Sequence, residues 1–211
     1  MIELVVFDLG GVLIEIVEGW RHAHKRAGVE VSAKMDEPGL RELLLRGFRD
    51  HELGILDESE FMSMWSSAMV CTKREALSVY EAWLIGPHFD IASLLIAIKE
   101  RGVSTACLSN TNETHWRAMS APSGPVSLPL NQFDFCFASH LMGMRKPSAK
   151  IYHHLCEVTQ ADPTRVLFFD DRLENVKAAR YCGWEAVLIG DKSPGSEIRG
   201  QLARYGVLRG G

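Results

Sequence analysis

Short apolar runs that recur along the chain constrain its fold more than any other feature. The opening run covers residues 4–7 and ends at Asp8, and the later runs cover residues 103–108, 133–138, 166–169 and 186–189. Between them, apolar residues recur at helical spacing, as in residues 91–98 before the glycine at position 102. Apolar strands that alternate with helices predict an α/β fold whose parallel sheet is covered on both faces.

Residues 15–88 interrupt this alternation with two helical patterns. The apolar positions of the two patterns are Leu40, Leu43, Leu44 and Phe48, and then Phe61, Met64, Trp65 and Ala68. Their spacing places each set on one face of a helix. The polar turn at residues 49–57 contains a glycine, so we expect the two helices to pack as an antiparallel pair. The predicted division is a helical cap at 15–88 and an α/β core at 1–14 and 89–211.

Three further segments carry local signals. Residues 120–132 hold three prolines, a glycine and three serines, which predicts an irregular loop at the surface or rim. Pro147 is predicted to occupy the first position of a helix. A helix is predicted from about Leu173 to Tyr181, and Gly183 is expected to close it.

Composition narrows the class of partner. The net charge of −4 leaves no basic excess for nucleic acid or an anionic membrane, so a small molecule is the expected partner. The expected oligomeric state is a monomer or a homodimer. No segment approaches the roughly 18 apolar residues of a membrane span, and no basic region precedes the first apolar run, so we expect neither export nor anchoring. The 5 cysteines include no C-x-x-C pair, which predicts a reducing cytoplasmic location and no zinc site.

Polar residues follow the predicted strands at their carboxyl ends, where open α/β sheets bind ligands. These residues are Asp8, Ser109, Asn110, Lys146, Asp170 and Asp171. Three clustered carboxylates would repel one another, so a cation is expected among them. Oxygen ligands with room for water suit Mg²⁺, and a hydroxyl and an ammonium nearby suit the oxygens of a phosphate.

This combination predicts phosphoryl chemistry. With the phosphate held in line, Asp8 is the candidate nucleophile and would form an aspartyl-phosphate that water hydrolyses. Lys146 and the metal would offset the charge of the transferring group, and Ser109 would orient it.

The order of these motifs resembles the haloacid dehalogenase superfamily over the whole chain. The motifs are Asp8-x-Gly-Gly-Val, Ser109-Asn110, Lys146-Pro147 and Asp170-Asp171-x-x-x-Asn175. The segments around these motifs, residues 108–112, 143–147 and 168–171, further resemble one branch of the superfamily. That branch contains bacterial sugar-phosphate phosphatases similar to α-glucose-1-phosphatase and the amino-terminal domain of epoxide hydrolases. The resemblance implies a Rossmann-like sheet with a helical cap inserted after the first strand.

The resemblance also implies roles for individual residues. Asp8 would be nucleophile and metal ligand, and Gly10 would offer its carbonyl to Mg²⁺. Asp170 and Asp171 would bind the metal, with Asn175 supporting the pair. Ser109 and Lys146 would hold the phosphate beside Asn110. The implied activity is Mg²⁺-dependent hydrolysis of a small phosphorylated metabolite such as a sugar phosphate.

One position departs from the family pattern. Phosphatases of this superfamily usually have an acid-base aspartate two residues after the nucleophile, where this chain has Gly10. The candidates to replace it are His51, Glu52, a substrate hydroxyl and a metal-bound water. Two other functions therefore stay open: a metal-independent 2-haloacid dehalogenase, and a phosphate-binding regulator with weak catalysis.

Within the predicted cap, His51 and Trp20 are the candidate substrate contacts. Core or solvated positions are the competing interpretation of both. His22 and His24 are two residues apart, so they would not share a helix face for metal binding.

Overall fold

The sheet at the centre of the molecule is entirely parallel. A computed structural model describes residues 1–190 and 192–209 of the protein. The strands of the sheet are β1 (Leu4–Phe7), β4 (Ser104–Ser109), β5 (Phe135–Ala138), β6 (Val166–Asp170) and β7 (Glu185–Leu188). Their spatial order is β5-β4-β1-β6-β7, with β1 in the middle. The parallel α/β sheet predicted from the sequence is therefore confirmed.

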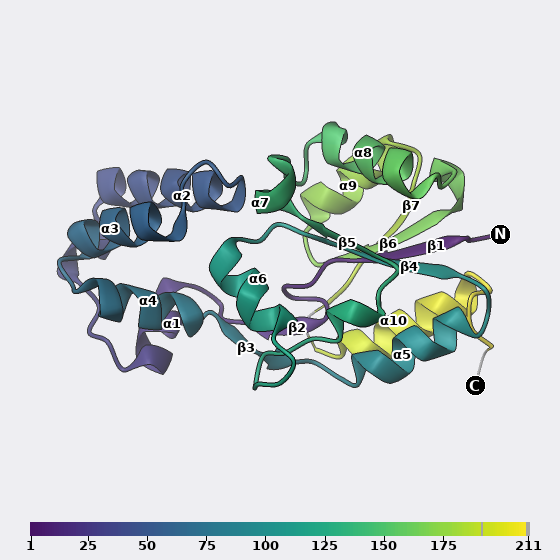
Figure 1. Ribbon diagram of the computed structural model, residues 1–211, viewed down its shortest axis with the longest axis horizontal. Coiled ribbons are helices and arrows are strands. Elements are labelled where there is room, and N and C mark those ends of the chain that lie inside the picture. Colours follow the sequence, from purple (N-terminus) through teal and green to yellow (C-terminus); the bar gives the residue numbers. More distant parts are fainter. Residues whose placement is uncertain (191, 210–211) are drawn as a thin grey trace.

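Helices cover both faces of this sheet (Figure 1). α5 (Ile91–Lys99) and α10 (Pro194–Arg204) lie on one face, and α8 (Ala149–Thr159) and α9 (Leu173–Tyr181) lie on the other. Alternate residues of a strand point to opposite faces. Val5 and Phe7 accordingly pack in the cluster with α5 and α10, and Leu4 and Val6 pack in the cluster with α8 and α9. Both faces of β1 are buried.

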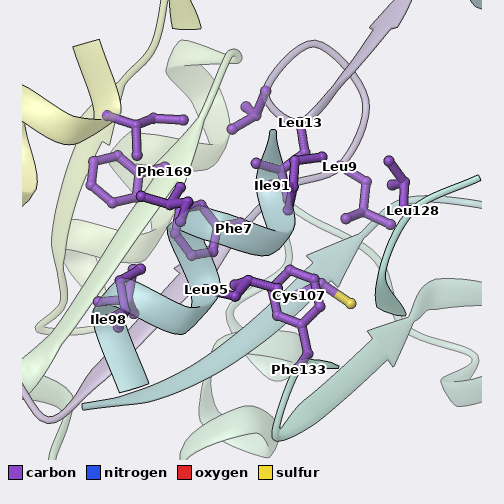
Figure 2. Close-up of a cluster of buried hydrophobic side chains, with 14 of the residues drawn as sticks. Phe7, Leu9, Leu13, Ile91, Leu95, Ile98, Cys107, Leu128, Phe133 and Phe169 are labelled. Carbon is purple, nitrogen blue, oxygen red and sulfur yellow. The ribbon is translucent and has the colours of Figure 1, made fainter. Parts of the chain in front are cut away.

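Figure 2 shows the first of these clusters. Phe7 stacks on Phe169 of the neighbouring strand with ring centroids 5.4 Å apart, and Ile91, Leu95 and Ile98 of α5 close over them. The predicted helix at 91–98 is thus confirmed with its apolar stripe facing the sheet. This packing fixes the end of β1, and therefore the position of the residue that follows it.

Four α-helices form a second unit at the end of the molecule away from both termini (Figure 1). They are α1 (Trp20–Ala27), α2 (Pro38–Glu52), α3 (Glu58–Met69) and α4 (Lys73–Glu81), with the 3₁₀-helix η1 (Ala33–Asp36) before α2. Asp57 and Thr72 begin α3 and α4 with capping boxes, each completed by a glutamate three residues later. The unit has its own apolar cluster around Phe61, Trp65 and Tyr80.

Two short antiparallel strands connect this unit to the sheet. β2 (Ile14–Ile16) pairs with β3 (Leu84–Pro87), and helices α1 to α4 lie between them in sequence. Residues 15–88 are mostly helical, as predicted, but the two ends of that segment form strands that were not predicted. Strands of three and four residues are too short for their periodicity to stand out in the sequence.

Two other local predictions are corrected. Leu43 is 40% exposed, whereas Leu44 is 4% exposed. One residue turns a helix by about 100°, so Leu43 lies beyond the edge of the apolar stripe. The loop after α6 (Glu113–Ser120) is irregular as predicted, apart from the 3₁₀-helix η2 (Leu130–Gln132), and most of it is exposed or partly exposed, but Leu128 and Leu130 are buried in the core.

The remaining described elements are the short helix α7 (Ser139–Met142) and the 3₁₀-helix η3 (Pro163–Arg165). α9 matches its predicted bounds, and Gly183 follows it with a φ of 90° that favours glycine. Among the described residues, no helix is long and apolar enough to cross a membrane.

Candidate active site

Three carboxylates meet at the carboxyl edge of the sheet. Asp8 directly follows β1, Asp170 is the last residue of the neighbouring strand β6, and Asp171 follows it. Each contributes an oxygen, and these oxygens all lie within 4.8 Å of one another. Asp8 and Asp170 are buried, and Asp171 is partly exposed. The gathering of these residues at one edge follows from the parallel strands that precede them.

The ammonium of Lys146 lies among the carboxylates. Its Nζ is 2.9 Å from Asp8 Oδ1 and 2.7 Å from Asp170 Oδ2, and it lies 5.3 Å from the centre of the Phe168 ring. Lys146 is 1% exposed. Burial by itself lowers the pKa of Lys146, but Asp170 and Asp8 outweigh burial and hold the pKa above its ordinary value. The side chain is therefore a fixed positive charge.

Negative charge is nevertheless in excess at this edge. Burial raises the pKa of Asp8 well above its usual range and Asp170 and Asp171 add to the rise, although Lys146 opposes it. Burial also raises the pKa of Asp171, and Asp170 contributes. One ammonium faces three carboxylates, so the cluster has the charge and the oxygen donors to take a cation.

Hydrogen bonds hold Asp170 in place. Asn175 donates through Nδ2 to both carboxylate oxygens at 2.9 and 3.1 Å, and the backbone N–H of Arg172 donates to Oδ1 at 2.8 Å. Asn175 lies in the first turn of α9 and is 2% exposed. Asp8 is held similarly, since the Leu9 N–H donates to its Oδ1 at 2.7 Å.

Asn110 connects the end of β4 to the segment that carries the lysine. Its Oδ1 accepts from the Lys146 N–H at 2.8 Å, and its Nδ2 donates to the Lys146 carbonyl at 2.9 Å. Because these bonds hold the backbone of Lys146, the helix starts later than predicted: Ser148 is the N-cap of α8 and Pro147 precedes it. The prediction that Pro147 opens the helix is wrong.

A cavity of 240 Å³ opens onto this edge of the sheet. Asp8, Gly10, Ser109, Asn110, Asp171 and Asn175 contribute to its lining. Lys146 and Asp170 are not part of that lining. Lys146 contacts both Asp8 and Asp170. The structure thus brings together every residue that the sequence predicted for the strand ends.

The two glycines after Asp8 differ. Gly11 has a φ of 79°, and a Cβ there would overlap the Asp171 carboxylate. A Cβ at Gly10 would have Ile16 Cγ2 as its nearest neighbour, at an ordinary contact distance of 3.6 Å. The backbone therefore requires glycine at position 11 and leaves room for a side chain at position 10.

Of the residues predicted in residues 15–88, Glu52 reaches the cavity. It ends α2, is 6% exposed, and its Oε2 accepts from Arg145 Nη2 at 2.8 Å and Nε at 3.1 Å. Arg145 also lines the cavity. Burial raises the pKa of Glu52 above its ordinary value despite the pairing with Arg145.

His51 and Trp20 lie elsewhere. His51 is buried, stacks on Phe61 with centroids 4.7 Å apart, and shares a hydrogen bond of 2.8 Å between Nδ1 and the Leu56 carbonyl. Trp20 packs against Trp65 and Trp83 and lines a second cavity of 620 Å³. Neither residue is part of the lining of the 240 Å³ cavity.

Sequence reasoning missed several residues that line the cavity. They are Ile14, Ile16, Phe48, Trp83, Leu84, Asn112, His115, Met119 and Arg172. The spacing places Phe48 on the apolar face of a helix, and Ile16 falls in the segment that is predicted to be mostly helical. The spacing of Asn112 and His115 is that of an N-cap and its third residue, which signals a helix start but not a place in a cavity.

The family model of haloacid dehalogenase-like hydrolases matches residues 2–183. The chain belongs to this family of hydrolases. The sesquiterpene phosphatase astK of Aspergillus oryzae is 26% identical over 191 residues, covering 88% of this chain and 89% of that protein. The D-ribitol-5-phosphate phosphatase of Bacteroides thetaiotaomicron is 26% identical over 197 residues, with coverages of 88% and 90%.

Bifunctional epoxide hydrolase 2 of Sus scrofa is 26% identical over 209 residues. The match covers 88% of this chain but spans only 36% of that longer protein. The family predicted from the sequence motifs is therefore confirmed, as is the similarity to epoxide hydrolases.

Solved structures show the same fold. An enzyme of the haloacid dehalogenase family from Bacteroides thetaiotaomicron superposes with a TM-score of 0.80 at 22% identity, covering 94% of this chain and 98% of that chain. A wild-type structure from the same organism in complex with magnesium and inorganic phosphate has a TM-score of 0.74 at 22% identity, with coverages of 94% and 99%.

Proposed function

We propose that the protein is a Mg²⁺-dependent phosphatase that hydrolyses phosphate monoesters of small metabolites. The observation that carries the proposal is the convergence of Asp8, Asp170 and Asp171 within 4.8 Å beside the Lys146 ammonium, at the base of a 240 Å³ cavity. Two relatives that match most of the chain are named as phosphatases, and their names support a phosphorylated substrate.

The residues present fit a magnesium ion. Asp8, Asp170 and Asp171 supply carboxylate oxygens, and Gly10, two residues after Asp8, lines the same cavity and would add its backbone carbonyl. Oxygen donors of this kind, with space for water, are those that Mg²⁺ takes. When bound, the ion would neutralise part of the negative charge of the carboxylates and of the substrate phosphate.

In this proposal Asp8 is the nucleophile. A carboxylate oxygen of Asp8 bonds to phosphorus as the bond from phosphorus to the leaving-group oxygen breaks, and water then hydrolyses the aspartyl-phosphate to free phosphate. Lys146 offsets the charge of the phosphoryl group, and Ser109 and Asn110 contact its oxygens from the end of β4. Asn175 keeps Asp170 oriented.

The leaving alcohol needs a proton that Gly10 cannot supply. Of the protein groups considered, Glu52 is the candidate that lines the cavity, and burial raises its pKa above the ordinary value although Arg145 opposes the rise. The four-helix unit that carries Glu52 would then act as a cap over the core. In this proposal the cap covers residues 15–88, and the core covers residues 1–14 and 89–211.

The role of Glu52 predicts a dependence on the leaving group. In Glu52→Gln, hydrolysis of alkyl phosphates should fall on the order of a hundredfold, because alkoxide leaves poorly without a proton. Hydrolysis of p-nitrophenyl phosphate should change little, because nitrophenolate leaves unprotonated. Equal loss on both substrates would contradict a general-acid role. Glu42→Gln, at an exposed position on the same helix, is the matched control.

A panel of phosphate monoesters tests the activity itself. Phosphate release that requires Mg²⁺ and stops with a chelator is expected for at least one member. Chloride release from 2-haloacids with chelator present would instead support the dehalogenase alternative. Binding of Mg²⁺ and orthovanadate without release from any ester would support a regulator.

A further inference from the structure

Part of the lining of the cavity is apolar, and we call this part the apolar wall. It is formed by Ile14, Ile16, Phe48, Trp83, Leu84 and Met119. Ile16, Phe48 and Trp83 are partly exposed, so parts of these side chains are free to contact a ligand. The aromatic rings are also supported from behind: Phe48 and Trp83 lie 6.1 Å apart, and Trp20 packs on Trp83 with centroids 4.4 Å apart.

Two polar residues in the lining are already committed to each other. Asn112 Oδ1 accepts from the His115 N–H at 3.0 Å, and Asn112 Nδ2 lies 3.2 Å from His115 Nδ1. His115 Nε2 lies 2.9 Å from the Tyr80 carbonyl. Burial lowers the pKa of His115 to about 4, so at neutral pH the ring is uncharged, donates from Nε2 and accepts at Nδ1. Both of its nitrogens are used.

Two other polar groups near the wall, Glu52 and Arg145, are hydrogen-bonded to each other. Both hydrogen bonds from Arg145 reach Oε2 of Glu52, and the Glu52 carbonyl accepts from Ser139 Oγ at 2.6 Å. Arg172 pairs with Glu174 at 2.8 Å. The pair of Glu52 and Arg145 offers a substrate one polar contact region, at the position where the proposed proton transfer takes place.

A polyol leaving group fits such a wall poorly. Each of its hydroxyls would lose water on entering and would meet methyl groups or ring faces, which costs free energy without a compensating hydrogen bond. An apolar chain gains from the same contacts, by about threefold to fourfold in affinity for each methylene that becomes buried.

We infer that the leaving group of the substrate is an apolar alcohol, such as an alkyl, prenyl or aryl alcohol, held against Ile16, Phe48 and Trp83. The inference rests on the proposed phosphatase function. It replaces the sugar phosphate expected from the sequence with the phosphate ester of an apolar alcohol.

A matched pair of substrates tests the inference by turnover. Pentyl phosphate and D-ribitol 5-phosphate share a carbon chain and differ in their hydroxyl groups. With Mg²⁺ present, kcat/KM is expected to be at least about tenfold higher for pentyl phosphate than for ribitol 5-phosphate. A hydrophobic pocket discriminates between substrates by factors of this size. An equal or higher value for ribitol 5-phosphate would overturn the inference and would leave the phosphatase proposal intact.

A binding series tests the wall without turnover. Calorimetry with methyl-, propyl- and pentylphosphonate, which cannot be hydrolysed, should show affinity that rises with chain length and a negative heat-capacity change. Equal affinity for the three would overturn the inference. Chain-length dependence together with no hydrolysis of any ester would support the apolar wall and contradict the phosphatase proposal.

Ile16→Thr keeps the β-branched shape of the side chain and adds a hydroxyl to the wall. It should weaken pentylphosphonate roughly threefold to tenfold and leave methylphosphonate unchanged. The control Ile96→Thr, on α5 and 53% exposed, should change neither affinity. Equal weakening of both phosphonates in Ile16→Thr would contradict a role in holding the chain.

Discussion

The carboxyl edge of the sheet and the apolar wall face the same cavity, but their side chains are held in different ways. At the edge, Asp8, Lys146 and Asp170 are buried, and the Lys146 ammonium lies 2.7 to 2.9 Å from a carboxylate oxygen of each aspartate. At the wall, Ile16 and Phe48 are partly exposed and packed by apolar contact alone. We therefore propose that the edge carries the chemistry and that the wall selects the leaving group.

Removing the nucleophile should have the largest effect. Asp8→Asn keeps the size of the side chain but is a poor nucleophile, so phosphate release should fall on the order of 10⁴-fold or more. Colorimetric phosphate release measures this, with Asp90→Asn as the control at the exposed N-cap of α5. Activity that persists in Asp8→Asn would place the chemistry elsewhere.

Removing the buried ammonium should destabilise the edge. Lys146→Gln leaves Asp8 and Asp170 without their shared positive partner, so the free energy of unfolding should fall by about 3 to 5 kcal/mol. Urea denaturation with a chelator measures it. The control Lys99→Gln breaks a pair with Asp134 at 2.9 Å that is more than a third exposed, and should cost about 1 kcal/mol or less. Similar losses of unfolding free energy in Lys146→Gln and Lys99→Gln would contradict the distinction between a buried and an exposed ion pair.

Restoring the missing carboxyl group should raise turnover. The space at Gly10 admits a side chain, so Gly10→Asp should increase kcat on alkyl phosphates by roughly a hundredfold if proton transfer is limiting. Gly10→Ala adds the Cβ without the acid and should leave kcat unchanged. If kcat changes equally in Gly10→Asp and Gly10→Ala, the carboxyl group has no effect on turnover and the prediction is contradicted.

The buried neutral histidine in the lining of the cavity predicts a pH dependence of stability. The pKa of His115 is lowered from 6.5 to about 4 by burial, so its contribution to stability is present above 6.5 and is lost as the pH falls toward 4. Between pH 7.5 and 5 this amounts to about 2 kcal/mol. Urea denaturation of His115→Gln should show a smaller pH dependence than the wild type. His153→Gln, at an exposed position, is the control, and an unchanged slope in His115→Gln would contradict the account.

The sheet and its edge follow from short sequence patterns. Strand runs such as residues 4–7 are continuous in the chain, and the acids come directly after them, so parallel pairing alone brings Asp8 and Asp170 together. Lys146 was identified by its order relative to the other motifs, because nothing local distinguishes it from a surface lysine.

The wall does not follow from such patterns. Ile16, Phe48 and Trp83 come from three separate segments, and each is apolar in a context that equally suits a core position. Their place in the cavity depends on the pairing of β2 with β3 and on the packing of α2 against α3, which no local spacing reveals. The start of α8 does not follow from local spacing either, because it depends on the hydrogen bonds between the Asn110 side chain and the Lys146 backbone.

Chemical trapping of the Asp8 carboxyl tests the central claim most directly. The protein would be mixed with Mg²⁺ and an alkyl phosphate, quenched, treated with borohydride and digested for mass spectrometry. An aspartyl-phosphate at Asp8 should be reduced, so the peptide should carry homoserine at that position, and only when both substrate and Mg²⁺ were present. Turnover with unmodified Asp8, or with modification at Asp170 or Asp171, would contradict the account.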